Sequence, residues 1–147
     1  MSFSICLSVP KSARYKSTTG MIRIGAFRES FEVTLIEWKC CDYLAQWTEA
    51  LGLIARGHKS CLMTDTRGLI IGTYTQVWCF YPAPKGGDVT IRNCLLKNTA
   101  CKRMGDWSYL RGHCPIRNRV SQMGNISEWR TSLESIRIFA NAQRWKP

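Results

Sequence analysis

Hydrophobic and small or polar residues alternate along several short stretches of the chain, which is the pattern of β-strands with one buried face. The alternation runs from Phe3 to Val9 and ends at Pro10, and it returns from Phe31 to Leu35. Between them, Met21–Phe27 is a short apolar stretch. The polar and basic segment 11–20 is rich in Ser and Thr, so we predict a loop there. The first quarter of the chain therefore predicts strands.

The pattern changes from period two to helical spacing after Asp42. Asp42 is a good N-cap residue, and Gly57 supplies a left-handed stop at the other end. We predict a helix between them that packs its wide apolar stripe against a sheet. The stripe consists of Tyr43, Trp47, Ala50, Leu51 and Ile54.

Aromatic and β-branched residues dominate the middle of the chain. They are concentrated in Cys61–Thr64, Leu69–Tyr81 and Val89–Leu96, and a turn-like Pro and Gly segment, 82–87, separates the last two stretches. This order predicts a central meander of strands. The basic segment 98–119 is interrupted by Gly and Pro, and we predict a long exposed connection there.

A last strand and a final helix are predicted near the end of the sequence. Ile126–Trp129 has strand character, and Thr131–Glu134 matches a capping box, which places the start of the helix at Thr131. The residues expected to be buried on this helix are Leu133, Ile136 and Phe139.

These elements predict an α+β fold. We expect a mainly antiparallel sheet of about five to seven strands, with the central Asp42 helix and the C-terminal helix packed on it. The 147 residues are the size of one domain, and neither a repeat nor a linker divides residues 1–147. No apolar run approaches the ~20 residues that cross a bilayer, and the start of the chain does not have the pattern of a signal peptide. We therefore expect one soluble, cytoplasmic domain.

The eight cysteines are interpreted mostly as reduced thiols, because the chain is longer than a typical disulfide scaffold and several cysteines lie in apolar runs. Metal binding is not expected. Cys40-Cys41, Cys94 with Cys101, and His113-Cys114 have neither finger nor ribbon spacing. No cofactor is predicted.

The net charge of +11 is unevenly distributed along the chain. Residues 1–28 have five basic and no acidic residues, and residues 89–147 have eleven basic and three acidic residues. Residues 29–88 are slightly acidic, with seven acidic and five basic residues. Such a field favours an acidic partner, a nucleic acid or an anionic surface, and it does not choose among them.

Catalysis is not predicted. The two histidines, His58 and His113, permit a histidine-dependent ribonuclease as a third hypothesis, but His58 directly follows the helix stop and needs no catalytic role there. The aspartates are isolated, and a phosphate-binding Gly-rich loop is missing. The second hypothesis is a nucleic-acid-binding module that uses Lys97–Arg119, where basic residues are interleaved with Trp107 and Tyr109.

An ordered set of short motifs resembles small bacterial immunity proteins of contact-dependent growth inhibition systems. The resemblance covers roughly residues 31–140. The motifs are Trp38, Asp42-Tyr43, Gln46-Trp47, Glu49-Ala50, Leu53 and Gly57, then Leu62-Met63-Thr64, Trp78 with Tyr81, Val89-Thr90-Ile91-Arg92-Asn93 with Leu95-Leu96, Ile126-Ser127-Glu128-Trp129, and Ser132-Leu133-Glu134-Ser135-Ile136 with Phe139.

This resemblance implies the first hypothesis, a cytoplasmic antitoxin. Such a protein binds the C-terminal toxin domain of its own system, often a nuclease, and blocks the active site or the entry of substrate. The resemblance implies no catalytic residue. Members of this family differ at the toxin-binding face, so the matching residues are expected to hold the fold.

Two faces remain open for toxin binding. Arg and aromatic residues dominate interface hot spots, which favours the basic segment. Its candidates are Lys102, Arg103, Trp107, Tyr109, Arg111, Arg117 and Arg119. Nuclease toxins are commonly basic, so this face requires a partner with an acidic patch such as active-site carboxylates. The alternative is the acidic middle segment, with Glu29, Glu32, Glu37, Asp42 and Glu49.

Overall fold

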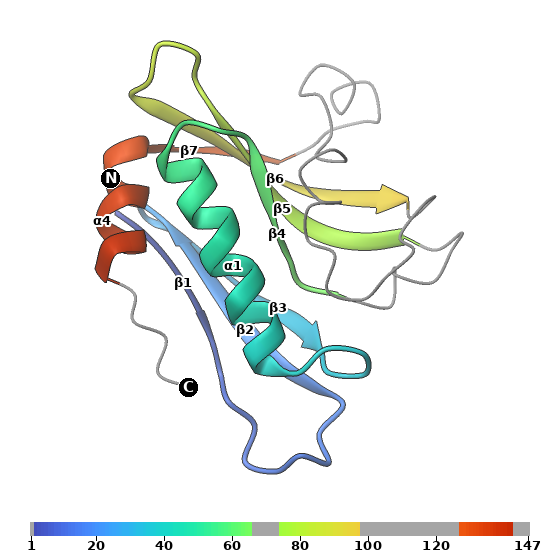
Figure 1. Cartoon of the computed structure of the whole chain (residues 1–147). Helices are drawn as coiled ribbons and strands as arrows, with labels where there is room; N and C mark the ends of the chain where they lie inside the picture. Colours follow the sequence, from blue (N-terminus) through green and yellow to red (C-terminus); the bar gives the residue numbers. More distant parts are fainter. Residues whose placement is uncertain (1, 66–73, 98–126, 143–147) are drawn as a thin grey trace.

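The structure is a computed structural model that describes residues 2–65, 74–97 and 127–142 (Figure 1). In chain order the described elements are β1 (Phe3–Leu7), β2 (Ser17–Ile24), β3 (Phe27–Thr34), α1 (Cys40–Ala55), β4 (Ser60–Met63), β5 (Tyr74–Pro82), β6 (Asp88–Lys97), β7 (Glu128–Ser132) and α4 (Leu133–Ala142). The predicted α+β class is confirmed. No helix in these ranges is long and apolar enough to cross a membrane.

The strands form two antiparallel sheets, where the sequence pattern predicted a single one. Sheet A has the order β1-β2-β3, and sheet B has the order β4-β5-β6-β7. In the chain α1 comes between β3 of sheet A and β4 of sheet B, and it packs against β4 (Figure 1). The link at this point is a long hydrogen bond from the Thr34 N–H to the Thr64 carbonyl, at 3.4 Å.

Sheet A turns one face toward the core and one toward solvent. Phe3 pairs with Ile24 and Ile5 pairs with Ile22, and all four side chains are buried on the inner face. A two-residue turn joins β2 to β3, and Gly25 adopts φ 60° there, a conformation that suits glycine. Gly20 lies under the Phe31 ring, which occupies the space that a Cβ would need.

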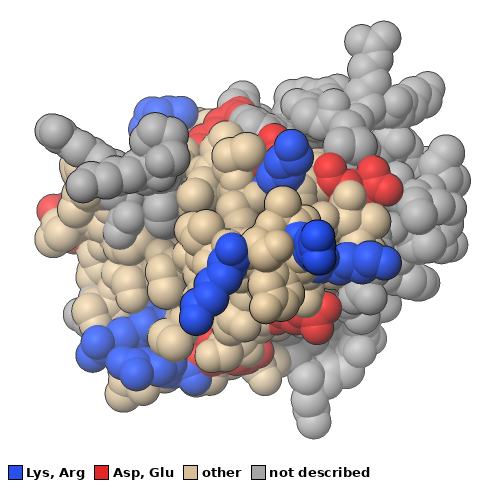
Figure 2. Space-filling model, turned by 90° about the horizontal axis from the view of Figure 1, so that it is seen from below, with Lys and Arg blue, Asp and Glu red and all other residues tan. Residues whose placement is uncertain are grey.

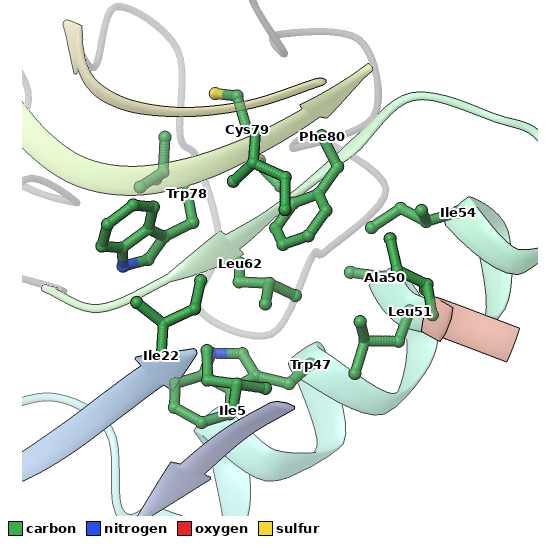
Figure 3. Packing of buried hydrophobic residues seen from close by; sticks show 14 of the residues in the cluster. Ile5, Ile22, Trp47, Ala50, Leu51, Ile54, Leu62, Trp78, Cys79 and Phe80 are labelled. Carbon is green, nitrogen blue, oxygen red and sulfur yellow. The ribbon is translucent and has the colours of Figure 1, made fainter. Parts of the chain in front are cut away.

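The hydrophobic core lies between the two sheets and α1 (Figure 3). Ile5 and Ile22 from sheet A point toward Trp78 and Phe80 from β5, and Trp47 from α1 fills the space beside them. Aromatic rings continue this contact across the sheets. Phe3 meets Phe80 edge-on at 5.6 Å, and Phe27 stacks on Trp129 at 4.3 Å. These two ring contacts therefore help to join the two sheets.

The first helix begins earlier than the sequence predicted. Its N-cap is Lys39, and Asp42 is the third residue of the helix, where its carboxylate accepts a hydrogen bond from the Lys39 N–H at 2.8 Å. As the N-cap or as the third helical residue, Asp42 brings its carboxylate to the positive end of the helix. The sequence therefore does not distinguish the two positions. The predicted stop is confirmed. Gly57 has φ 87°, and the N–H of His58 reaches back to the Leu53 carbonyl at 3.0 Å.

The final helix begins later than predicted. Thr131 still pairs with Val89 as part of β7, and the capping oxygen is Ser132 Oγ, which accepts a hydrogen bond from the Ser135 N–H at 3.0 Å. The predicted buried residues, Leu133, Ile136 and Phe139, are buried.

Other boundaries also shift. The predicted loop 11–20 gives its last four residues to β2, because Ser17 to Gly20 pair with the end of β3. The last strand is Glu128–Ser132, where 126–129 was expected. The predicted strand over Leu69–Tyr81 is described only from Tyr74, as β5, and it continues to Pro82.

Candidate protein interface and the residues that frame it

Two neighbouring side chains of α1 cover the free edge of β4. The amide of Gln46 donates to the Cys61 carbonyl at 2.8 Å and accepts from the Met63 N–H at 3.0 Å. The indole of Trp47 donates to the Met63 carbonyl at 2.7 Å. Gln46 is 2% exposed and Trp47 is fully buried. The helix thus satisfies three backbone groups that a strand edge would otherwise leave open.

A second set of contacts holds the beginning of α1 between the two sheets. The hydroxyl of Tyr43 donates to the Thr34 carbonyl at 2.6 Å, and the Thr34 hydroxyl donates to the Asp65 carboxylate at 3.0 Å. Trp38 packs edge-on against the Tyr43 ring at 5.1 Å. Tyr43, Gln46 and Trp47 of the Asp-Tyr-x-x-Gln-Trp motif are therefore buried, and they fix how α1 packs against both sheets.

An ion pair joins two motifs that are far apart in the sequence. Arg92 on β6 donates through Nε to the Glu128 carboxylate on β7 at 2.8 Å. The side chain of Arg92 is 9% exposed and that of Glu128 is 26% exposed. These residues face each other across the two strands, so the pair lies at the end of the β6–β7 ladder.

The predicted basic interface falls in that connection. All seven candidates, Lys102, Arg103, Trp107, Tyr109, Arg111, Arg117 and Arg119, lie outside the described residues, as does His113. The described part fixes where the connection leaves the fold, after Lys97 at the end of β6, and where it returns, at Ser127 before β7.

The alternative acidic face is not a single surface. Glu29 and Glu32 lie on opposite faces of β3, since Glu29 is half-buried on the face of Phe27 and Phe31, which pack against the core, whereas Glu32 is exposed. Asp42 is committed to the helix N-terminus. Glu29, Glu32 and Asp42 therefore do not form one acidic face. On the face of the molecule seen from below, acidic and basic side chains are likewise interspersed (Figure 2).

An open groove of about 560 Å³ lies near the β5–β6 turn and was not predicted from the sequence. Its lining includes Tyr81, Thr90 and Arg130, which are neighbours across β5, β6 and β7. Lys59 and Asp88 also line the groove. Strand register, which the sequence does not reveal, brings these residues together.

The predictions about thiols and metals can be compared with part of the chain. Six cysteines are described, and none of these forms a disulfide. Cys61, Cys79 and Cys94 are buried, whereas Cys6 and Cys41 are exposed. Partial burial raises the pKa of the Cys40 thiol, and the neighbouring Cys41 raises it further. Among the described residues, no group of three or more His, Cys, Asp or Glu side chains could hold a metal ion. His58 is exposed just after α1.

Comparison with known families shows which proteins share these motifs. The model of the CdiI N-terminal domain matches residues 33–139. The chain belongs to the CdiI N-terminal domain family. The resemblance to immunity proteins of contact-dependent growth inhibition is thereby confirmed. The matched range includes the α1 motif and the Arg92–Glu128 pair. The region that defines the family therefore contains the contacts that hold the fold together.

A solved structure shares this architecture. It is the CdiA-CT/CdiI toxin and immunity complex from Enterobacter cloacae, which contains a chain that is similar with a TM-score of 0.76. The sequence identity is 21%, and the similarity covers 95% of this chain and 97% of that chain. At this identity the likeness concerns the fold. Comparison with curated proteins gave no match.

Proposed function

We propose that this CdiI-family protein binds the C-terminal toxin domain of its cognate effector in a one-to-one complex and neutralises it by covering the active site or the entry of substrate. The observation that carries the proposal is the family match over residues 33–139. The similar Enterobacter cloacae chain belongs to a complex described as one of toxin and immunity protein. A nuclease is the toxin class that we favour, and the cytoplasm, where nucleic acids are exposed to such a toxin, is the expected location.

The burial of the motif residues is consistent with binding through other, exposed residues. Gln46, Trp47 and Arg92 are buried and make hydrogen bonds to strand edges or to a neighbouring strand. Because these motif residues are occupied inside the fold, recognition falls to exposed side chains outside the motifs. A protein of this kind keeps its fold while its partner specificity changes.

We place the toxin contact on the basic connection between β6 and β7, with Arg103, Arg111 and Trp107 as its central residues. Arg and Trp are the residue types most enriched in interface hot spots. A nuclease active site commonly contains carboxylates, and a positive loop is complementary to them even when the rest of the toxin is basic.

The test begins with co-purification of the chain with the toxin domain of its own system, followed by calorimetry and a growth assay. We expect a tight one-to-one complex and protection of cells that express the toxin. Absence of a complex, with nucleic acid retained on the chain, would instead favour the binding module built on Lys97–Arg119.

The contact face is tested with two double charge reversals of equal size. Arg103→Glu with Arg111→Glu should slow association about tenfold or more, because both the local contact and the steering field are lost. Lys11→Glu with Arg14→Glu changes the net charge equally at exposed positions after β1 and should have a much smaller effect. Equal effects of the two variants would show that the basic connection speeds association only through its net charge. If neither variant slows association, the toxin binds elsewhere.

A further inference from the structure

The backbone hydrogen bonds determine which groups of sheet A are left at its edge. Ser8 donates to the Thr19 carbonyl at 2.9 Å, and Gly25 donates to the Ser2 carbonyl at 2.7 Å. The odd-numbered residues of β2 therefore bond to β1, and its even-numbered residues bond to β3. In the register observed, the β2-facing groups on β3 belong to its odd-numbered residues. The N–H and C=O groups of Arg28, Ser30, Glu32 and Thr34 consequently point away from the sheet.

Only one of these four residues uses its edge groups within the described part of the chain. Thr34 donates to the Thr64 carbonyl at 3.4 Å and accepts from the Tyr43 hydroxyl at 2.6 Å. For Arg28, Ser30 and Glu32, no partner for these groups exists among the described residues. All three residues are exposed. They form an open edge three pairing positions long, which we call the β3 edge.

Two other strand edges of the molecule are protected. Gln46 and Trp47 cover the edge of β4. The edge of β1 lies against α4, and its residues Phe3 and Ile5 are only 6% and 1% exposed (Figure 1). Proteins generally cover or blunt such edges because an open edge pairs with another strand. Among the described residues, the β3 edge differs from these two edges in having open backbone groups at three positions, and such an edge can pair with another strand.

The side chains along the β3 edge are complementary to themselves. We propose that β3 of a second copy of this chain pairs antiparallel with the β3 edge across a twofold axis at Ser30. In this register Arg28 lies opposite Glu32 of the second copy, and the two Ser30 residues face each other. The open backbone groups of both copies then meet, which makes a continuous sheet of six strands from two copies of sheet A.

The electrostatics within one copy favour this arrangement. Arg28 lies directly opposite Arg23 on β2, and like charges in such positions repel. Neither arginine forms an ion pair with a described carboxylate, and Arg23 donates instead to the Gly25 carbonyl at 3.2 Å. Glu32 is opposite the uncharged Thr19. Pairing across the twofold axis brings a carboxylate, Glu32 of the second copy, to Arg28.

A second copy fits this edge better than an arbitrary extended segment. Any strand can supply the backbone groups, but the side-chain order here requires a carboxylate and a cation four residues apart in the opposite direction. The chain's own β3 meets that requirement. It also covers the half-buried ring of Phe31 on the inner face. The small number of paired positions predicts a reversible dimer, which forms with rising protein concentration.

Charge exchange tests the pairing directly, by sedimentation of the intact chain over a range of concentrations. The wild-type chain should dimerise. Arg28→Glu alone and Glu32→Arg alone should each weaken self-association about tenfold or more, because every dimer then contains two pairs of like charges. The double variant should dimerise again. An equimolar mixture of the two single variants should form heterodimers, because each edge then complements the other.

Controls separate this pairing from general charge and from toxin binding. Arg14→Glu and Glu37→Arg make the same charge changes at exposed positions away from the β3 edge, and they should leave dimerisation unchanged. The proposal is wrong if the wild-type chain stays monomeric at the highest concentration, or if mixing the single variants restores nothing. It is also wrong if Arg28→Glu abolishes toxin binding but not self-association, since the edge then serves the toxin. The proposed antitoxin function does not depend on any of these results.

Discussion

Replacement of Gln46 by Leu tests the idea that α1 acts as the missing neighbour of β4. The side chain is 2% exposed and makes two hydrogen bonds, one to the Cys61 carbonyl and one from the Met63 N–H. Leucine has a similar volume, so little cavity should form. It offers neither a donor nor an acceptor, however, and both backbone groups would be left buried without these partners.

The expected loss of stability follows from that count. A buried polar group without a partner costs about 1–3 kcal/mol, and two groups are affected. The greater hydrophobicity of leucine offsets part of this cost, so we expect the free energy of unfolding to fall by about 2–4 kcal/mol. Domains of ordinary stability have about 5–15 kcal/mol in total, so the variant should remain folded but be clearly weaker.

Urea unfolding followed by tryptophan fluorescence measures this effect. The midpoint should fall by about 1–2 M at the slopes usual for single domains. Ala45→Leu introduces the same residue on the exposed face of α1 and should change stability by less than about 0.5 kcal/mol. Equal midpoints for Gln46→Leu and wild type would show that these two hydrogen bonds do not stabilise the fold. The role assigned to the helix would then be wrong.

Three further predictions concern other parts of the framework. Gly20→Ala should lower the free energy of unfolding by about 1–3 kcal/mol, because the new methyl group displaces the Phe31 ring; a thermal melt equal to wild type would contradict this packing. Glu128→Gln should cost about 1–3 kcal/mol by leaving the Arg92 charge largely buried without its carboxylate, and chemical denaturation that gives no loss would remove the pair from the framework. The raised pKa of Cys40 means less thiolate at a given pH, so iodoacetamide should modify it more slowly than an unperturbed thiol at pH 8, with a rate that still rises at higher pH; peptide mapping that finds fast labelling would oppose this.

The local elements could be predicted from the sequence because their signals are local. Period-two alternation located β1 and the second half of β3, aromatic and β-branched composition located β4, β5 and β6, and Gly57 marked the end of α1 within one turn. The errors lie at boundaries where two arrangements satisfy the same chemistry. Asp42 stabilises the helix N-terminus whether it is the N-cap or the third helical residue. Ser132 replaced Thr131 as the cap because strand pairing with β6 kept Thr131 extended.

The division into two sheets could not be predicted, because alternation records which face of a strand is buried and not which strand lies beside it. The same limit applies to the groove at Tyr81, Thr90 and Arg130, whose residues meet only through register. It applies also to the β3 edge. Which residues of β3 have open backbone groups depends on the turn at Gly25, since moving that turn by one residue would reverse the assignment.

Gln46 contains information about the fold that the helical spacing of apolar residues did not reveal. It occupies the buried side of α1 beside Trp47, and a buried amide must find partners. Within a helix the backbone groups are already bonded to each other, so the partners must come from another element with open groups. A strand edge is the usual source of such groups. The amide can satisfy the Cys61 carbonyl and the Met63 N–H together because those residues are two apart on β4 and point the same way. A glutamine next to a tryptophan on the apolar stripe of a helix therefore predicts that the helix lies along an edge strand, and that the sheet ends there.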